Sequence, residues 1–177
     1  MAIENILSDL ASSRETREAL YKDFHRHPEL SLQEYSTADR IEAELKACGI
    51  EVVRIGRTGV VGVINNGEGP VVAMRGDIDA LPMAERSGKE YAATGVTQID
   101  ETTGQPTPVA HTCGHDVHIV CLLGAAKALN DHRQEWSVTF LAVFQPGEEN
   151  AAGARAMVDA GIVDKLPRPD VYLGQHV

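Results

Sequence analysis

Cysteine, aromatic and basic residues are all scarce in this chain of 177 residues. The 3 cysteines are too few, and odd in number, to form a disulfide framework, which favours a reducing compartment. Lys and Arg total 16 against 26 Asp and Glu, giving a formal net charge of −10. Nucleic-acid binding relies on clustered basic side chains, so this charge balance argues against a nucleic-acid partner.

Long apolar runs are absent as well. No stretch approaches the roughly 18 consecutive apolar residues of a membrane-spanning helix, and the first five residues lack the basic and apolar regions of a signal peptide. We therefore expect a cytoplasmic protein without a membrane partner. The composition itself, 43% hydrophobic and 24% charged residues, is typical of a globular domain with a buried core.

The N-terminal part of the chain has apolar residues at helical spacing. The first helical segment should end at Pro28, because the residue before a proline is pushed out of the α region. A second helix follows, for which Ser36 or Thr37 is the expected N-terminal cap and Gly49 the expected stop.

Short β-branched runs then predict three strands, at residues 52–55, 59–64 and 71–74. Residues 65–69 are rich in Asn and Gly, which tolerate the backbone angles of a tight turn, so the last two strands are predicted to form a hairpin. Residues 87–108 form a long polar stretch with little periodicity, and loops of this length are often functional or mobile.

Helices and strands alternate in the second half of the chain. Residues 117–130 predict a buried helix in which Cys121 is a small core residue, and residues 138–144 predict a central strand that is buried on both faces. A helix at 151–160 and a strand at 170–173 follow. The alternation predicts an α/β fold with a mixed, mainly parallel sheet sandwiched by helices.

The segment 111–118 holds the densest group of reactive side chains, with one thiol, three imidazoles and one carboxylate. Cys113 and His115 can turn toward one point, because Gly114 between them permits a backbone conformation that other residues resist. Thiolate and imidazole together suit a transition metal such as zinc. A buried thiol beside a loop histidine, without any metal, is the alternative.

Further polar groups follow three of the predicted strands. Glu148 and Glu149 come directly after the central strand, where one could bind a metal while the other takes a proton from water. They could also be an acidic pair at a helix N-terminus. His176 follows the last strand, and Asp77 and Asp79 follow the strand at 71–74, where they could be simple strand-end caps. Open α/β sheets place their sites at such strand ends.

Five motifs, taken together in this order, resemble one known family. They are residues 26–30 (RHPEL), 75–82 (RGDIDALP), 111–118 (HTCGHDVH), 146–149 (PGEE) and 174–177 (GQHV). The chain resembles the amidohydrolase group that contains hippurate hydrolase and the auxin–amino-acid conjugate hydrolases, within the aminoacylase and zinc-carboxypeptidase superfamily of metallopeptidases. The resemblance covers essentially the whole chain.

The resemblance implies a centre of two divalent metal ions, which could be zinc, manganese, nickel or cobalt. It implies Glu148 as the general base that activates the attacking water. Asp79 matches a position that orients a ligand in related enzymes, and His111 and His118 are interpreted as supporting residues rather than ligands. The implied metal ligands are Cys113, His115, Glu149 and His176.

The resemblance also implies an incomplete zinc-exopeptidase-like domain. Residues 1–177 would be the N-terminal part of the catalytic domain, without the inserted dimerisation domain and without the C-terminal part that carries a further histidine ligand. The full-length protein would be a homo-oligomer. Its substrate would be a small N-acyl amino acid, hippurate-like or N-acetylated, cleaved to a carboxylic acid and a free amino acid.

Two alternatives stay open at this point. Cys113 could act as the nucleophile of a cysteine hydrolase, with a nearby histidine as its base. The chain could also be an inactive partial fold, or a metal-binding module without turnover.

Overall fold

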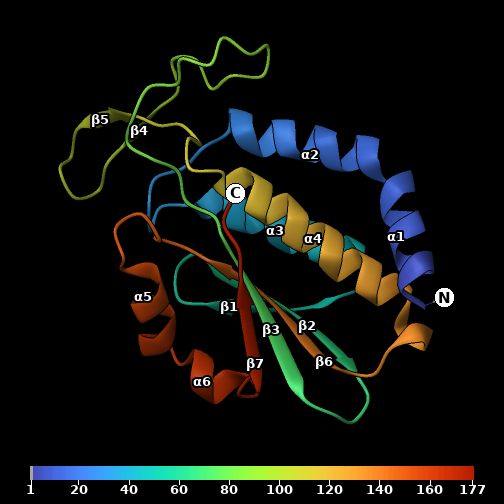
Figure 1. Ribbon diagram of the computed structural model, residues 1–177. Coiled ribbons are helices and arrows are strands. Elements are labelled where there is room, and N and C mark those ends of the chain that lie inside the picture. Colours follow the sequence, from blue (N-terminus) through green and yellow to red (C-terminus); the bar gives the residue numbers. More distant parts are fainter. Residues whose placement is uncertain (1) are drawn as a thin grey trace.

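A five-stranded sheet runs through the middle of the protein in the computed structural model, which describes residues 2–177, with side chains described from residue 4 onward (Figure 1). The strand order is β1-β2-β6-β3-β7. Strand β2 is antiparallel to both of its neighbours, whereas β6, β3 and β7 are parallel, so four of the five strands point the same way. The strands are β1 (Glu51–Ile55), β2 (Gly59–Asn66), β3 (Val71–Asp77), β6 (Val138–Gln145) and β7 (Val171–Gly174).

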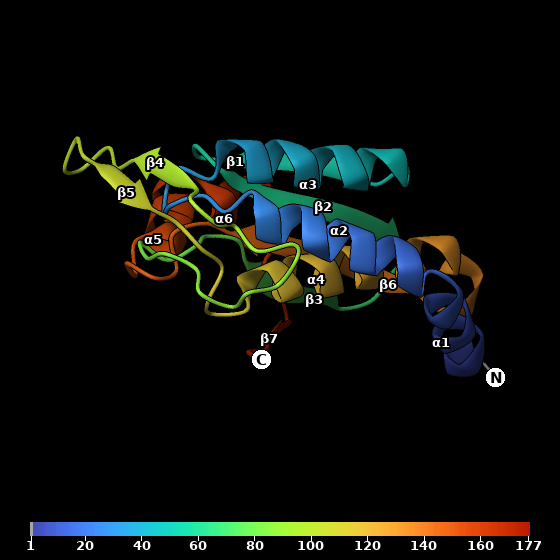
Figure 2. The same cartoon turned by 90° about the horizontal axis from the view of Figure 1, so that it is seen from above.

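Helices cover both faces of the sheet. Helices α2, α3 and α4 lie together on one side, and the shorter α5 and α6 lie on the other (Figures 1 and 2). The mixed, mainly parallel α/β sandwich predicted from the sequence is thereby confirmed. The helices are α1 (Ala2–Ser12), α2 (Arg14–Arg26), α3 (Tyr35–Ala47), α4 (His115–Asp131), α5 (Gly153–Asp159) and α6 (Ile162–Lys165), with a short 3-10 turn, η1, at Arg133–Glu135. No helix in the described part of the chain is long and apolar enough to cross a bilayer.

Strand β6 holds the two layers of the core together. Side chains of a strand alternate between its faces, so Phe140, Ala142 and Phe144 join the core under α2, α3 and α4. Leu141 and Val143 point the other way and pack in the core under α5 and α6. A central strand that is apolar on both faces explains why helices cover both sides of the sheet.

The predicted hairpin between residues 59–64 and 71–74 is wrong. Strand β6 lies between β2 and β3, and the backbone of Phe140 is opposite Ile64 on one side and Val72 on the other. A strand with two apolar faces is most stable in the middle of the sheet, and it separates β2 from β3 there. The hairpin forms instead between β1 and β2, where Ile55 pairs with Gly59.

Several helix boundaries also differ from the prediction. The N-terminal helical segment is interrupted at Ser13, whose hydroxyl bonds back to the carbonyl oxygens of Asp9 and Leu10. Helix α3 begins at Tyr35, and neither Ser36 nor Thr37 caps it. The carboxylate of Glu29 accepts the backbone N–H groups of both residues instead, at 3.1 and 2.7 Å.

Three further local predictions concern the end of α3, the burial of Cys121 and the polar stretch at 87–108. The backbone φ of +72° at Gly49 ends α3 as predicted. Cys121 lies on the solvent side of α4 and is exposed, so its interpretation as a core residue is wrong. The polar stretch at 87–108 contains a two-stranded ribbon formed by β4 (Thr97–Ile99) and β5 (Pro106–Pro108).

We predict that Leu122→Ala destabilises the fold by about 2–5 kcal/mol, because it leaves a cavity between α4 and the sheet. Leu122 is 1% exposed. The matched control is Val163→Ala on α6, which is 67% exposed and should change stability by less than about 0.5 kcal/mol. Urea unfolding measures both. Equal effects of the two substitutions would contradict the packing described here.

Candidate metal centre

The predicted site residues gather at one edge of the sheet. Strands β3, β6 and β7 are parallel, so the segments that follow them emerge at the same edge, where α4 also begins. Asp79 follows β3, the glutamate pair follows β6, and the last histidine follows β7. We call five of these residues the centre: Cys113, His115, Glu148, Glu149 and His176.

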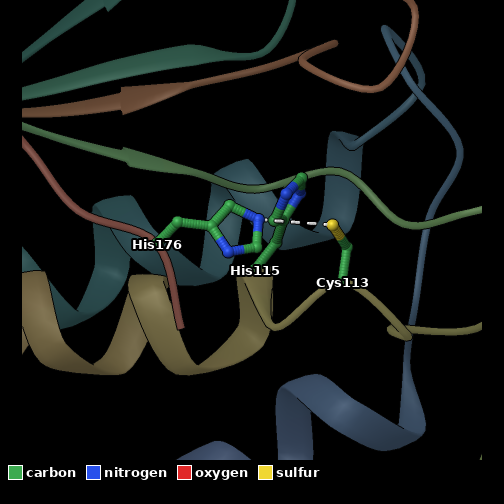
Figure 3. A group of neighbouring side chains, drawn as sticks. All are labelled: Cys113, His115 and His176. Carbon is green, nitrogen blue, oxygen red and sulfur yellow. Dashed lines mark hydrogen bonds between the residues drawn. The ribbon is translucent and has the colours of Figure 1, made fainter.

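The side-chain atoms of the centre lie close enough to share cations. The Sγ of Cys113 is 3.4 Å from Nε2 of His176 (Figure 3). The Nε2 of His115 lies 3.7 Å from Oε2 of Glu148 and 3.7 Å from Oε1 of Glu149. Donor atoms of Cys113, His115 and His176 lie within 4.8 Å of one another, and so do those of His115, Glu148 and Glu149. His115 belongs to both groups, so the structure brings all five predicted residues together around it.

Asp79 orients His115. The imidazole is fully buried, and its Nδ1 lies 2.9 Å from the carbonyl oxygen and 3.2 Å from Oδ1 of Asp79. With the proton on Nδ1, the lone pair of Nε2 points into the centre. The other carboxylate oxygen of Asp79 accepts the hydroxyl of Ser31 at 2.6 Å and the backbone N–H of Glu149 at 3.0 Å. Asp79 therefore holds a histidine and the glutamate turn in one arrangement.

Two buried atoms of the centre have no hydrogen-bond partner among the described residues. They are Nε2 of His115 and Oε1 of Glu149, which face each other. An unsatisfied buried polar atom costs about 1–3 kcal/mol, so native proteins rarely leave two side by side. A cation between them would accept both lone pairs. The set of sulfur, nitrogen and oxygen donors fits zinc and related transition metals.

The remaining histidines of the segment 111–118 lie beside the centre. His118 bonds to Asp77 through Nδ1, and its Nε2 accepts the backbone N–H of Val177 at 3.1 Å, so both ring nitrogens are engaged. Donor atoms of Asp77, His115 and His118 also lie within 4.8 Å of one another. Neither nitrogen of the buried His111 has a hydrogen-bond partner among the residues that the structure describes, and burial lowers the pKa of His111 to about 4, which keeps the ring neutral.

Carboxylates dominate the electrostatics of the centre. Burial alone would lower the pKa of His115, but Asp79 and Asp77 outweigh it and raise that pKa to about 8. Burial and the neighbouring Glu149, followed by Glu148 and Asp77, raise the pKa of Cys113 to about 11. A nucleophilic cysteine needs a lowered pKa, so this environment disfavours Cys113 as a nucleophile. The same negative potential attracts a divalent cation.

An α/β domain with sulfur, nitrogen and oxygen donors at the carboxyl ends of parallel strands has the features of a metallohydrolase. Residues 73–177 match the sequence profile of Peptidase family M20/M25/M40, and the chain belongs to this family. The resemblance seen in the five motifs is thereby confirmed.

Individual relatives are similar to this chain in sequence. The chain is 40% identical over 163 residues to N-acetylcysteine deacetylase of Bacillus subtilis, a match that covers 86% of this chain and 40% of the relative. It is 38% identical over 154 residues to IAA-amino acid hydrolase ILR1-like 5 of Arabidopsis thaliana. This match covers 86% of this chain and 32% of the relative. The chain therefore spans well under half the length of these relatives.

A solved structure is similar over nearly the whole chain. It is described as a dinuclear metal binding peptidase of the M20 family from Bacillus subtilis. The TM-score is 0.79 at 35% sequence identity, and the match covers 94% of this chain and 43% of that one.

We predict that the metal-free protein loses stability as the pH rises through the pKa of His115. The pKa is raised from 6.5 to about 8 on folding, so the stabilisation is fully present below pH 6.5 and lost as the pH passes about 8. Asp79→Asn removes one of the two carboxylate charges that raise this pKa, and Asp77 keeps the other. Urea unfolding with a chelator, at about pH 6 and about pH 9, should show a smaller pH dependence for the variant. An identical dependence in both proteins would contradict the Asp79–His115 coupling.

Proposed function

We propose that this chain carries the metal centre of an amidohydrolase that cleaves N-acyl amino acids to a carboxylic acid and a free amino acid. The observation that carries the proposal is a pair of buried atoms on His115 and Glu149, beside Cys113 and His176, that have no hydrogen-bond partner within the described residues 2–177. The names of the relatives support the substrate class, because N-acetylcysteine and IAA-amino acids are both amino acids with an acyl group. Hippurate-like and N-acetyl amino acids are therefore the substrates to test.

We propose Cys113, His115, Glu149 and His176 as metal ligands. Their donor atoms converge, and each belongs to a type that transition metals accept. Two divalent ions are proposed, with zinc, manganese, nickel and cobalt as candidates. The similar structure described as dinuclear supports the number of ions.

Glu148 is proposed as the general base. Its side chain is 38% exposed, against 17% for Glu149, so it can exchange protons with water and substrate. Divalent cations bound here would polarise the amide carbonyl and make water a better nucleophile. Glu148 would take the proton from the attacking water and pass it to the nitrogen of the leaving amine. The backbone of Glu149 is meanwhile held by Asp79, which suits a ligand with a fixed position.

We also propose that residues 1–177 are the N-terminal part of a larger catalytic domain. The short share of the relatives' length that the chain spans supports this. Strand β7 supports it as well, because Val171, Tyr172 and Leu173 are 46%, 56% and 47% exposed at the edge of the sheet. An apolar groove of about 480 Å³ lies between β6, α5 and α6, and Tyr172 is among the residues that line it. The inserted dimerisation domain, the homo-oligomer and the cytoplasmic location stay predictions.

A metal-binding module without turnover is the second candidate function. The observation in its favour is that the four proposed ligands would have to serve two ions, whereas catalytic zinc ions usually have three protein ligands each. Metal binding combined with no hydrolysis of hippurate or N-acetyl amino acids, at any added metal concentration, would favour this candidate.

We predict that Cys113→Ala loses bound metal, because it removes the only sulfur donor of the centre. Cys121→Ala is the matched control, since this cysteine is exposed on α4 and away from the site. Elemental analysis of the purified proteins after zinc or manganese loading measures the effect. Retained metal in Cys113→Ala would refute the ligand assignment.

We predict that Glu148→Gln keeps its metal and loses about 10²–10⁴-fold in turnover, the usual range for removal of a general base. The amide is close in shape to the carboxylate but cannot take the proton. Hydrolysis of N-acetyl amino acids by the full-length protein, measured beside metal content, separates the two effects. Full activity in this variant would exclude Glu148 as the base.

A chelator separates the metal-dependent reaction from a cysteine-nucleophile reaction. EDTA should abolish hydrolysis, and added zinc or manganese should restore it. Activity that survives complete removal of metal would instead support Cys113 as the nucleophile.

A further inference from the structure

Glu34 is a fully buried carboxylate that is not one of the five residues of the centre, and its hydrogen bonds join three separate segments. Its Oε1 accepts the backbone N–H groups of Leu32 and Gly147, both at 2.8 Å. Its Oε2 accepts the hydroxyl of Thr58, in the turn between β1 and β2, at 2.7 Å. The residue is 0% exposed and stands directly before α3.

Burial of this carboxylate carries a large desolvation free energy. In the described part of the chain, no lysine or arginine forms an ion pair with Glu34, and burial raises its pKa. The three hydrogen bonds that the carboxylate accepts offset part of this desolvation free energy. An apolar residue could fill this volume without that cost, so the contacts that the carboxylate makes need a reason.

The contact with Gly147 leads directly to the centre. Gly147 has a φ of +53°, and a Cβ atom here would lie 2.8 Å from Cδ2 of Leu32. Its carbonyl oxygen accepts the backbone N–H groups of Ala152 and Gly153 at 3.1 and 2.9 Å, which closes the turn between β6 and α5. Gly147 therefore holds this turn in place through its N–H group, which Glu34 binds, and through its carbonyl oxygen.

Two buried carboxylates hold this turn, each at a different residue. Glu34 binds the N–H of Gly147, and Asp79 binds the N–H of Glu149. Glu148 is the one residue between these two anchored positions. Its backbone direction, and with it the direction of its side chain toward His115, depends on both anchors.

We propose that Glu34 is a positioning residue, which fixes the Gly147 N–H and thereby places Glu148 and Glu149 relative to His115. The inference rests on the proposed function for its effect on metal binding and turnover. Its effect on the turn itself does not depend on any metal. Without the carboxylate, the N–H groups of Gly147 and Leu32 lose their partner, and the turn gains freedom at the place where the glutamates start.

The geometry and the charge of Glu34 can be separated by substitution. In Glu34→Gln the amide oxygen can still accept the two N–H groups, and the amide nitrogen can donate to the hydroxyl of Thr58. This variant should therefore behave almost as the unmodified protein. Glu34→Ala removes all three bonds. Glu34→Asp keeps the charge but is one methylene shorter, so it should not reach Gly147 and Thr58 together.

The test compares these variants with Leu45→Ala, a matched control on α3 that is also buried, 1% exposed, and packs in the core against Gly62 of β2. Zinc or manganese affinity, kcat, KM and Tm are measured for each. Glu34→Ala should lose about 10–100-fold in metal affinity, as loss of a residue that orients ligands does. Its kcat should fall, and its KM should change less than its kcat. Glu34→Gln should lose less than about 10-fold in metal affinity. Leu45→Ala should lower Tm and leave metal affinity unchanged.

Each outcome decides the role of Glu34. If Glu34→Ala lowers Tm but leaves metal affinity and kcat as Leu45→Ala does, the residue is only structural and the inference is overturned. A Glu34→Gln variant as impaired as Glu34→Ala also overturns it. If Glu34→Ala does not fold, Glu34→Asp decides, and affinity equal to that of the unmodified protein contradicts the proposal.

Amide hydrogen exchange of residues 147–153 in the metal-free protein tests the inference separately from the proposed function. Glu34→Ala should exchange faster in this segment than the unmodified protein, and Glu34→Gln should not. Unchanged exchange in Glu34→Ala overturns the positioning role. If the unmodified protein binds no metal, the proposed function fails, while the exchange rates still decide whether Glu34 fixes the turn.

Discussion

The hydrogen bond between Asp79 and Nδ1 of His115 is the interaction on which the centre depends. It turns the opposite nitrogen of a fully buried ring toward Glu149, and the same carboxylate holds the backbone of Glu149. Two buried atoms that could bind a metal, Nε2 of His115 and Oε1 of Glu149, thus face each other without a hydrogen-bond partner in the described part of the chain. The arrangement is unfavourable when empty and favourable around a cation, so the fold supplies part of the organisation that binding would otherwise require.

The sheet explains how residues from distant parts of the sequence reach this point. Strands β3, β6 and β7 are parallel, and their carboxyl ends bring the aspartate, the glutamate pair and the last histidine to one edge. Strand β6 is central because it is apolar on both faces, and its end at Gln145 places the glutamate turn in the middle of that edge. The turn is then fixed by Glu34 at the N–H of Gly147 and by Asp79 at the N–H of Glu149. Packing of the core and the chemistry of the site are therefore linked through a few buried carboxylates.

Much of this could be predicted from the sequence, because the signals were local. The apolar run at 138–144 indicates a central strand. The thiol and imidazoles of segment 111–118, together with the paired glutamates after that strand, indicate a metal site. The partner of each strand could not be predicted, because pairing depends on which strand best fills the middle of the sheet, and so β6 replaced the hairpin expected around residues 65–69. Glu34 gave no signal, because an acidic residue before a helix resembles an ordinary cap and its contact with Gly147 spans 113 positions.

The most direct test of the account is X-ray absorption spectroscopy at the zinc edge of the zinc-loaded protein. A centre that contains Cys113, His115, Glu149 and His176 predicts a sulfur neighbour at about 2.3 Å together with nitrogen and oxygen neighbours at about 2.0–2.2 Å. The sulfur shell should disappear in Cys113→Ala and persist in Cys121→Ala. A spectrum of the unmodified protein with oxygen and nitrogen neighbours alone would contradict the assignment of the thiol to the centre, and with it the proposed arrangement around His115.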